Sequence, residues 1–167
     1  MNKLLLGAVG LSAVLASCGG VSVDDTRGIR SEYQLATDVR DQSTGATLSA
    51  GTYVICDNTN TDVELNVSWL AGTQAINLVA SGQYYGEGRS LATYDVSGTP
   101  GGNAALLFTI GAYTAPLKVK PQAIIVTPVT NVDIKGYTRL GVRTVDSQGN
   151  AGTVQYSSYV FPVVDCI

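Results

Sequence analysis

The chain has 167 residues, of which 45% are apolar and only 14% are charged, so it is long enough for one packed domain and unlike a disordered segment. It carries 10 lysine and arginine residues against 13 aspartate and glutamate residues, and it lacks the dense basic patches through which proteins bind nucleic acid. Histidine is absent, which excludes Ser-His-Asp and Cys-His catalytic arrangements.

Residues 1–17 have the three parts of a bacterial export signal. Lys3 supplies a positive charge, the segment from Leu4 to Leu15 is apolar, and the small residues Ala16 and Ser17 follow. The apolar segment is shorter than the about 20 residues that a transmembrane helix needs. We therefore predict a signal peptide over residues 1–17 rather than a membrane-spanning helix.

The signal peptide is followed at once by a cysteine, in the sequence Leu15-Ala16-Ser17-Cys18. These four residues resemble, at every position, the lipobox of bacterial lipoprotein precursors. The resemblance implies that Cys18 receives a diacylglycerol, that cleavage follows Ser17, and that the acylated Cys18 becomes the first residue of the mature chain. Each buried methylene contributes about 0.8 kcal/mol, so two or three acyl chains hold a protein stably at a membrane. Gly19 stands where some lipoproteins of the inner membrane have Asp, so we expect the outer membrane.

The segment after the cysteine is polar. Residues 18–30 are rich in Gly, Ser, Asp and Thr, with little regular apolar spacing, which favours a flexible tether between lipid and domain. Residues 31–167 are then expected to form one domain. Loss of the leader removes Lys3 and leaves nine basic against 13 acidic residues, a net charge of -4. This balance opposes phosphate binding, and we expect no nucleic-acid partner.

With Cys18 assigned to lipid, two cysteines remain, Cys56 and Cys166. An exported chain reaches compartments that permit disulfides, so a bridge between these two is the simplest pairing. Two free buried thiols are the alternative. Metal binding is less favoured, because two distant cysteines without histidine cannot form a tetrahedral all-thiolate site. We expect no metal and no cofactor.

Alternation of apolar and polar residues with a period of two predicts β-strands in the rest of the chain. Short strand-like segments bounded by turn residues occur at Tyr53–Cys56, Val63–Trp69, Ala75–Val79 and Leu106–Ile110. No stretch after the leader has the spacing of an amphipathic helix. Between Lys118 and Val132, Pro121 and Pro128 flank an apolar run, which indicates an edge strand or a sheet-crossing connection, because proline lacks a backbone donor.

The clearest hairpin lies near the C-terminus. Tyr137–Val145 leads into the turn residues Asp146–Asn150, and the chain returns at Thr153–Tyr156. This hairpin resembles the last two strands of an immunoglobulin-like or fibronectin type III-like sandwich, and Val63–Trp69 is similar to an early core strand ending in Trp. The resemblance implies an all-β fold, a single antiparallel β-sandwich, with Tyr137 as a tyrosine-corner residue.

The same resemblance places the two cysteines. If residues 48–56 form the first strand of the sandwich, it ends near the pole at which the last strand ends, and Cys56 meets Cys166 there. Residues 31–40 would then form an extra strand or a hairpin arm.

Residues that could carry catalysis or bind metal are few. Paired carboxylates for a glycosidase are not apparent, because Asp24 and Asp25 lie in the expected tether and Glu64 and Glu87 have no obvious partners. The oxygen-rich turn Asp57–Asp62 invites a calcium hypothesis, but it lacks the glycine and the distal glutamate of an EF-hand loop. A polar turn between strands is favoured instead. We expect no catalytic residue and no enzymatic activity.

The stretch from Ser81 to Ser90 has the composition of a recognition loop. It combines three glycines with Tyr84, Tyr85 and Arg89, side chains of the kind enriched in binding surfaces. A hairpin tip whose tyrosines cover the sandwich is the alternative. The predicted function is that of a lipid-anchored envelope protein that docks on another envelope or surface-layer protein as a structural or accessory subunit. The alternative is a lipid-anchored module that binds carbohydrate or another small ligand through this loop.

Overall fold

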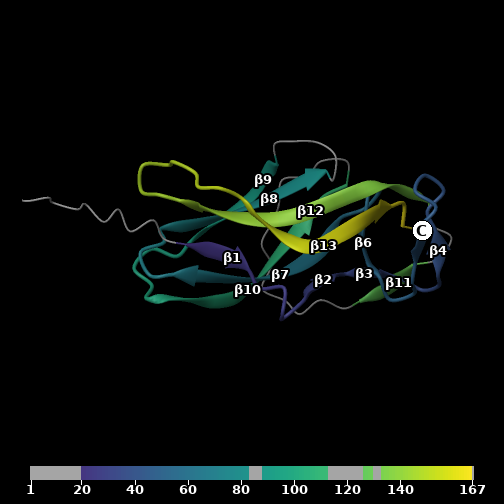
Figure 1. The fold of residues 1–167 in the computed structure, drawn as a ribbon, viewed down its shortest axis with the longest axis horizontal. Helices are drawn as coiled ribbons and strands as arrows, with labels where there is room; N and C mark the ends of the chain where they lie inside the picture. The colour runs from purple at the N-terminus through teal and green to yellow at the C-terminus, as the bar shows by residue number, and fades with distance from the viewer. Residues whose placement is uncertain (1–19, 83–87, 113–125, 130–132, 167) are drawn as a thin grey trace, which may run out of the picture.

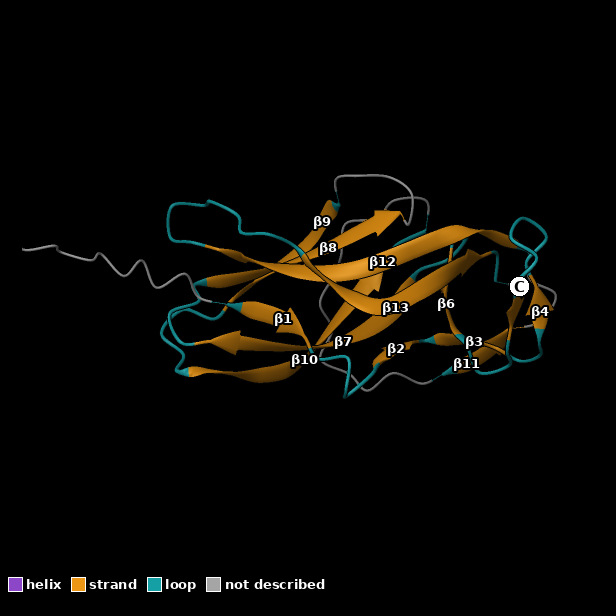
Figure 2. Ribbon diagram, in the orientation of Figure 1, coloured by secondary structure: helices purple, strands orange, loops and turns teal. Residues whose placement is uncertain are grey.

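The structure is a computed structural model that describes residues 20–82, 88–112, 126–129 and 133–166. Within these ranges the chain forms strands joined by turns, and none of it forms a helix of the length and apolarity that crossing a membrane requires. The molecule is elongated, and the long strands follow its long axis (Figures 1 and 2). The predicted all-β class is confirmed.

The first sheet is built around β7 (Thr61–Leu70). On one side β7 pairs antiparallel with β10 (Gly101–Ile110) over ten consecutive register pairs. On its other side it pairs antiparallel with β1 (Val21–Val23) and then with β2 (Ile29–Ser31). Alternate residues of β7 are buried, as the apolar alternation predicted.

The second sheet is larger and contains the predicted C-terminal hairpin, formed by β12 and β13. Its strand order is β11 (Thr127–Val129), β3 (Tyr33–Leu35), β6 (Tyr53–Cys56), β13 (Gln155–Val164), β12 (Ile134–Val145), β8 (Ala75–Gly82), β9 (Arg89–Asp95). β11 stands at one end of this order, which confirms the predicted edge position of Pro128; Pro121 lies outside the described residues. β4 (Val39–Arg40) and β5 (Thr47–Leu48) form a separate hairpin whose strands have two residues each.

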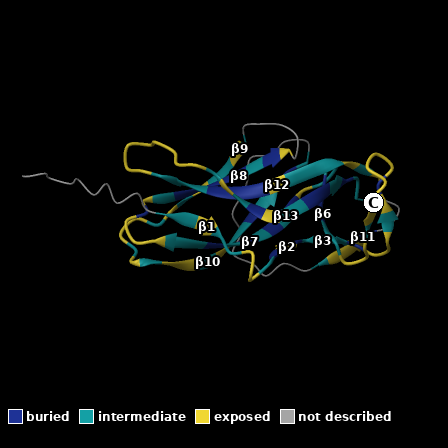
Figure 3. Cartoon of the chain, viewed as in Figure 1, coloured by how far each residue is buried: buried dark blue, intermediate teal, exposed yellow. Residues whose placement is uncertain are grey.

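The two sheets enclose one main core. Its fully buried side chains come from both sheets and include Val63, Leu65, Phe108, Leu78, Leu140 and Phe161. Burial of each such side chain contributes about 1.5–3 kcal/mol. Figure 3 shows the buried residues along the strands and the exposed residues gathered in the turns. The predicted β-sandwich is confirmed, and the extra strand expected from residues 31–40 is present as β3 and β4.

The predicted flexible tether over residues 18–30 is wrong for the part that the structure describes. The Gly20 carbonyl oxygen accepts a hydrogen bond from the Leu70 N–H at 2.8 Å, and β1 and β2 continue the pairing with β7. The Asp25 carboxylate accepts a hydrogen bond from the Ser157 hydroxyl at 2.8 Å and another from the Ser158 N–H at 2.9 Å. The sandwich therefore begins no later than Gly20. Polar composition was misleading, because an edge strand pairs through its backbone groups whatever its side chains.

Tyr137 makes a long-range contact. Its hydroxyl donates to the Asp41 carboxylate at 2.5 Å, whereas residues 130–132, where a tyrosine corner would find its backbone partner, lie outside the described residues, so the tyrosine corner stays a prediction. Asp41 is buried, and it follows β4 directly. The contact therefore ties the hairpin of β4 and β5 to β12.

Hydroxyl and amide donors surround the Asp41 carboxylate. It accepts the Thr44 hydroxyl at 2.6 Å and the hydroxyl and N–H of Ser43 at 2.7 and 2.8 Å, besides the Tyr137 hydroxyl. These hydrogen bonds hold the pKa of the Asp41 carboxyl well below its usual range, and the bond from Thr44 has the largest effect.

We expect Asp41→Asn to lower the Tm at neutral pH, because the ionised carboxylate binds these donors more strongly than an amide. The depressed pKa means that the stabilisation is full above the unfolded-state pKa of about 3.9 and disappears as pH falls toward the folded-state pKa. The Tm deficit of the variant should therefore be constant above about pH 5 and shrink below about pH 4. Thermal melts across this range measure it. A deficit that is equal in acid and at neutral pH would contradict the role of the charge.

Candidate functional site

β6 and β13 run parallel and end together at a disulfide. Val163 pairs with Ile55 and Val164 with Cys56, and Cys56 is joined to Cys166 with a Cα–Cα distance of 5.4 Å. The predicted bridge is confirmed, and Cys56 meets Cys166 where β6 and the last strand end together. The expectation that residues 48–56 form the first strand of the sandwich is wrong, because β6 covers only Tyr53–Cys56 and β1, β2 and β3 precede it. The alternative of two free thiols is excluded.

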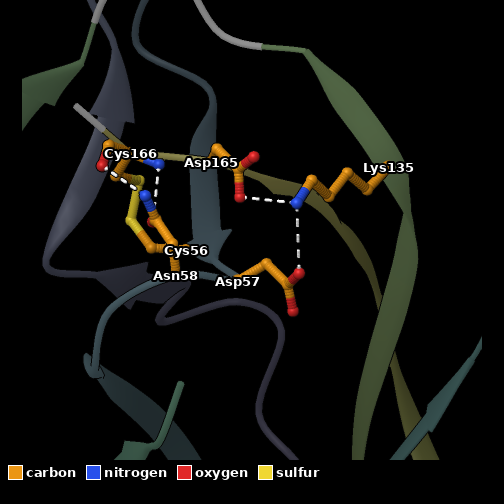
Figure 4. A network of polar contacts seen from close by, with 6 residues as sticks. All are labelled: Cys56, Asp57, Asn58, Lys135, Asp165 and Cys166. Carbon is orange, nitrogen blue, oxygen red and sulfur yellow. Dashed lines mark hydrogen bonds and ion pairs between the residues drawn. A yellow bond between two sulfur atoms is a disulfide. The ribbon is translucent and has the colours of Figure 1, made fainter. Parts of the chain in front are cut away.

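Asn58 reinforces the covalent link with two hydrogen bonds. Its amide nitrogen donates to the Cys166 carbonyl oxygen and its amide oxygen accepts the Cys166 N–H, both at 2.9 Å (Figure 4). The Cys56 N–H donates to the Thr61 hydroxyl at 2.9 Å. Cys166 is therefore held by the covalent bond to Cys56 on β6 and by two hydrogen bonds to Asn58, in the turn between β6 and β7.

An ionic cluster lies beside the disulfide. The Lys135 Nζ atom is 2.7 Å from Asp165 Oδ1 and 3.4 Å from Asp57 Oδ2 (Figure 4). The hydrogen bond to Asp165, with that to Asp57, raises the pKa of Lys135. Each of the three side chains is more than a third exposed, so the cluster adds little to stability. It gives the surface next to the disulfide a fixed arrangement of charges.

The oxygen-rich turn Asp57–Asp62 makes contacts with protein groups. Asp57 binds Lys135, the Asn60 amide oxygen accepts the Ala112 N–H at 3.2 Å, and Asp62 accepts the Thr109 hydroxyl at 2.5 Å. Within the described ranges no group of three Asp, Glu or Cys side chains is placed to hold a metal ion. The oxygens that suggested calcium thus belong to a polar turn between strands.

A cavity of about 270 Å³ lies beside the disulfide, where several strands end. Apolar side chains form most of its wall, among them Ile55, Leu91, Ile110 and Val163. Arg89 and Asp57 supply charged groups. A ligand that suits this lining has an apolar body and one group that accepts hydrogen bonds from a guanidinium.

The predicted binding residues are only partly described. Arg89 is exposed at the start of β9 and lines the cavity, whereas Tyr84, Tyr85 and Cys18 lie outside the described residues. The structure brings Arg89 together with the end of β6, which sequence reasoning missed. No local pattern could have indicated this neighbourhood, because it arises from strands that are distant in sequence and pair in register.

β10 offers a second candidate surface along its outer edge. The Asn66 carbonyl oxygen accepts a hydrogen bond from the Asp24 N–H at 2.8 Å. Because the backbone groups of successive residues in a strand point to opposite sides, the even-numbered residues of β7 bond toward β1 and β2. The odd-numbered residues of β7 bond toward β10. In the register of Ala104 opposite Val67, the even-numbered residues of β10 therefore bond to β7. The odd-numbered ones, such as Ala105, point their N–H and C=O groups away from the sheet.

The contact from Tyr94 agrees with this assignment. Its hydroxyl donates to the Leu107 carbonyl oxygen at 3.3 Å, and Leu107 is odd-numbered. Burial raises the pKa of Tyr94 to about 12, so the hydroxyl keeps its proton in the working pH range. Among the described residues, β10 makes its strand pairing with β7 alone.

We expect the double variant Cys56→Ser, Cys166→Ser to lose roughly 4 to 5 kcal/mol of unfolding free energy, because the disulfide closes a loop of 110 residues. Urea denaturation of the oxidised protein and the variant measures the loss. Asn58→Ala is the matched control, since it removes the two hydrogen bonds to Cys166 and keeps the disulfide. A loss of less than about 1 kcal/mol in the double variant would contradict a stabilising bridge.

Comparisons of the chain with protein-family models, with curated proteins and with solved structures find no match. The lipoprotein signature and membership of an immunoglobulin-like or fibronectin type III-like family accordingly stay predictions from the sequence.

Proposed function

We propose that the chain is a lipid-anchored protein of the bacterial cell envelope that docks on another envelope or surface-layer protein as a structural or accessory subunit. Two features support the location. The lipobox supplies Cys18 as the site of acylation, and the Cys56–Cys166 disulfide suits an oxidising compartment outside the cytoplasm. No catalytic residue enters the proposal.

The outer edge of β10 is the observation that supports docking on a protein. Among the described residues no second strand pairs with it, and at Leu107 its carbonyl oxygen accepts the Tyr94 hydroxyl. Natural sheets protect long edges with charged side chains, proline or bulges. β10 has the sequence Gly-Gly-Asn-Ala-Ala-Leu-Leu-Phe-Thr-Ile, without charge or proline, and its register with β7 is unbroken. By contrast, β9 carries Arg89 and Asp95 and pairs with β8 through a register shift.

Such an edge fits a partner that adds a strand. The outward N–H and C=O groups of Asn103 and Ala105 alternate along β10 with groups that bond to β7, as strand addition requires. An extended segment of the partner would pair with these groups and gain its affinity from the backbone. We therefore propose β10 as the contact strand.

The position of Gly20 supports access to this edge in an anchored protein. Gly20 bonds to Leu70, which pairs with Gly101 at the start of β10. Ile110, at the other end of β10, lines the cavity and is about 30 Å away along the strand, at about 3.3 Å per residue. An anchor at Cys18 would hold the first end at the bilayer and let β10 extend away from it.

We expect Ala105→Pro to abolish partner binding while the sandwich stays folded, because it removes an outward N–H that β7 does not use and proline is tolerated at strand edges. Ala104→Pro is the matched control. It removes an N–H that bonds to β7, so it should lower the Tm. The native chain and each variant are purified by affinity in mild detergent. Mass spectrometry then identifies the co-purified partner and compares its amount between them.

The same purification tests the location. Mass spectrometry of the N-terminal peptide should show an acylated Cys18 as the first residue. An unmodified Cys18 would refute the lipid anchor, and a partner that Ala105→Pro retains in full would refute docking through β10.

A module that binds a small ligand is the second candidate function, and the cavity beside Arg89 favours it. A carbohydrate would place its apolar ring face on Leu91 and Ile110 and its hydroxyls on the guanidinium of Arg89. We expect a glycan array to give a signal that Arg89→Ala reduces about tenfold, the effect of losing a charge-assisted hydrogen bond. An array without a signal would remove this candidate.

A further inference from the structure

Three segments meet at the end of the sandwich that includes Gly20: residues 20–22, 68–74 and 96–102. None of them contains Asp, Glu, Lys or Arg, and the nearest acidic residues, Asp95 and Asp146, lie beside them. Gly101 pairs with Leu70, and the Val96 N–H donates to the Gln74 carbonyl oxygen at 2.9 Å. We call this surface the N-terminal pole.

Leu70 is the outstanding apolar group of the N-terminal pole. Its side chain is 66% exposed, and it is the one large hydrophobic residue that is exposed among those the structure describes. It packs on Gly20, where an added Cβ would come within 3.0 Å of its Cδ1 atom. A groove of about 290 Å³ adjoins it, lined by Gly20, Val21, Ser22, Ser68, Trp69 and Leu70. Leaving such a side chain in water is unfavourable.

Trp69 is held rigidly next to it. Its indole N–H donates to the Thr99 hydroxyl at 2.9 Å. Its ring lies over Gly102, where an added Cβ would approach to 3.3 Å. Trp69 is also the single tryptophan of the chain, so it reports on this pole alone.

The short separation of Cys18 and Gly20 indicates which surface would cover this pole. Cys18 precedes Gly20 by two residues, so their Cα atoms are at most about 7 Å apart even in a fully extended chain. The Gly20 carbonyl oxygen is bonded to the Leu70 N–H, which leaves no length for a long tether. An acyl group on Cys18 would therefore hold the N-terminal pole against the bilayer.

We propose that the N-terminal pole rests in the interface of the lipid bilayer, with Leu70 inserted and Trp69 at the level of the headgroups. This inference rests on the acylation of Cys18 put forward above and goes beyond it, since an acylated protein with a long tether would leave the pole in water. Tryptophan prefers this interface because its ring is amphipathic. The pole thus sets the orientation of the sandwich on the membrane.

The charges around the pole indicate which lipids it contacts. Asp95 and Asp146 flank it, since both Asp95 and Val145 pair with Ala75. Hydrogen bonds from Ser97 and from Asn150, respectively, lower the pKa of these two carboxyls, so both are ionised at neutral pH. Because these carboxylates repel anionic lipids, the contact between the pole and the bilayer is apolar. Zwitterionic phosphatidylcholine is therefore the suitable probe.

The test uses the full acylated chain in phosphatidylcholine vesicles whose acyl chains are brominated near the headgroup. We expect Trp69 fluorescence to fall about twofold relative to vesicles without bromine, since an interfacial ring lies within about 10 Å of the label. Leu70→Asn should restore most of the emission. The matched control is the double variant Trp69→Phe, Thr47→Trp, which moves the reporter to the exposed β5 hairpin and should not be quenched.

Vesicle flotation and mass spectrometry of Cys18 separate the two levels of the proposal. A chain that is acylated and floats, but whose Trp69 emission is unchanged by bromine, overturns the interfacial pole and leaves the anchor standing. Equal quenching of the native chain and of the control variant with the relocated reporter overturns it as well. A chain that is neither acylated nor floats overturns both, whereas quenching confined to Trp69 and relieved by Leu70→Asn supports both.

Discussion

The structure depends on the pairing of β7 along both of its edges. Its even-numbered residues hold β1 and β2, and its odd-numbered residues hold β10. Its buried face, through Val63, Leu65 and Val67, supplies much of the core. One strand therefore fixes Gly20 and β1 in the sheet, determines which backbone groups of β10 point outward, and brings the first sheet onto the second.

The parts of the fold that were predictable are those that side chains encode. Alternation identified β6 and β7, and turn residues identified the hairpin of β12 and β13, because burial of one sheet face selects residues with a period of two. β1 was missed, since its pairing with β7 uses the backbone and its neighbours are polar. The bond between Tyr137 and Asp41 joins residues 96 positions apart, and no local pattern reports such a distance.

The candidate sites divide in the same way. Cys56 and Cys166 were paired by counting cysteines, an argument that needs no geometry. The cavity beside Arg89 and the outward groups of β10 depend on register, which is a property of paired strands rather than of one segment. Leu70 is an ordinary apolar residue in the sequence, and only its exposure beside Gly20 in the structure suggests the role that we propose for it.

The antiparallel pairing of β1 with β7 has a mechanical consequence. A force that pulls Gly20 away from the sandwich acts along β1, so it loads the hydrogen bonds between Val21–Val23 and β7 together, in shear, instead of opening them one at a time. Asp25 adds a second attachment through Ser157 on β13. A domain fastened in this way would resist extraction at the end that we propose lies at the membrane, while its opposite end is closed by a covalent bond.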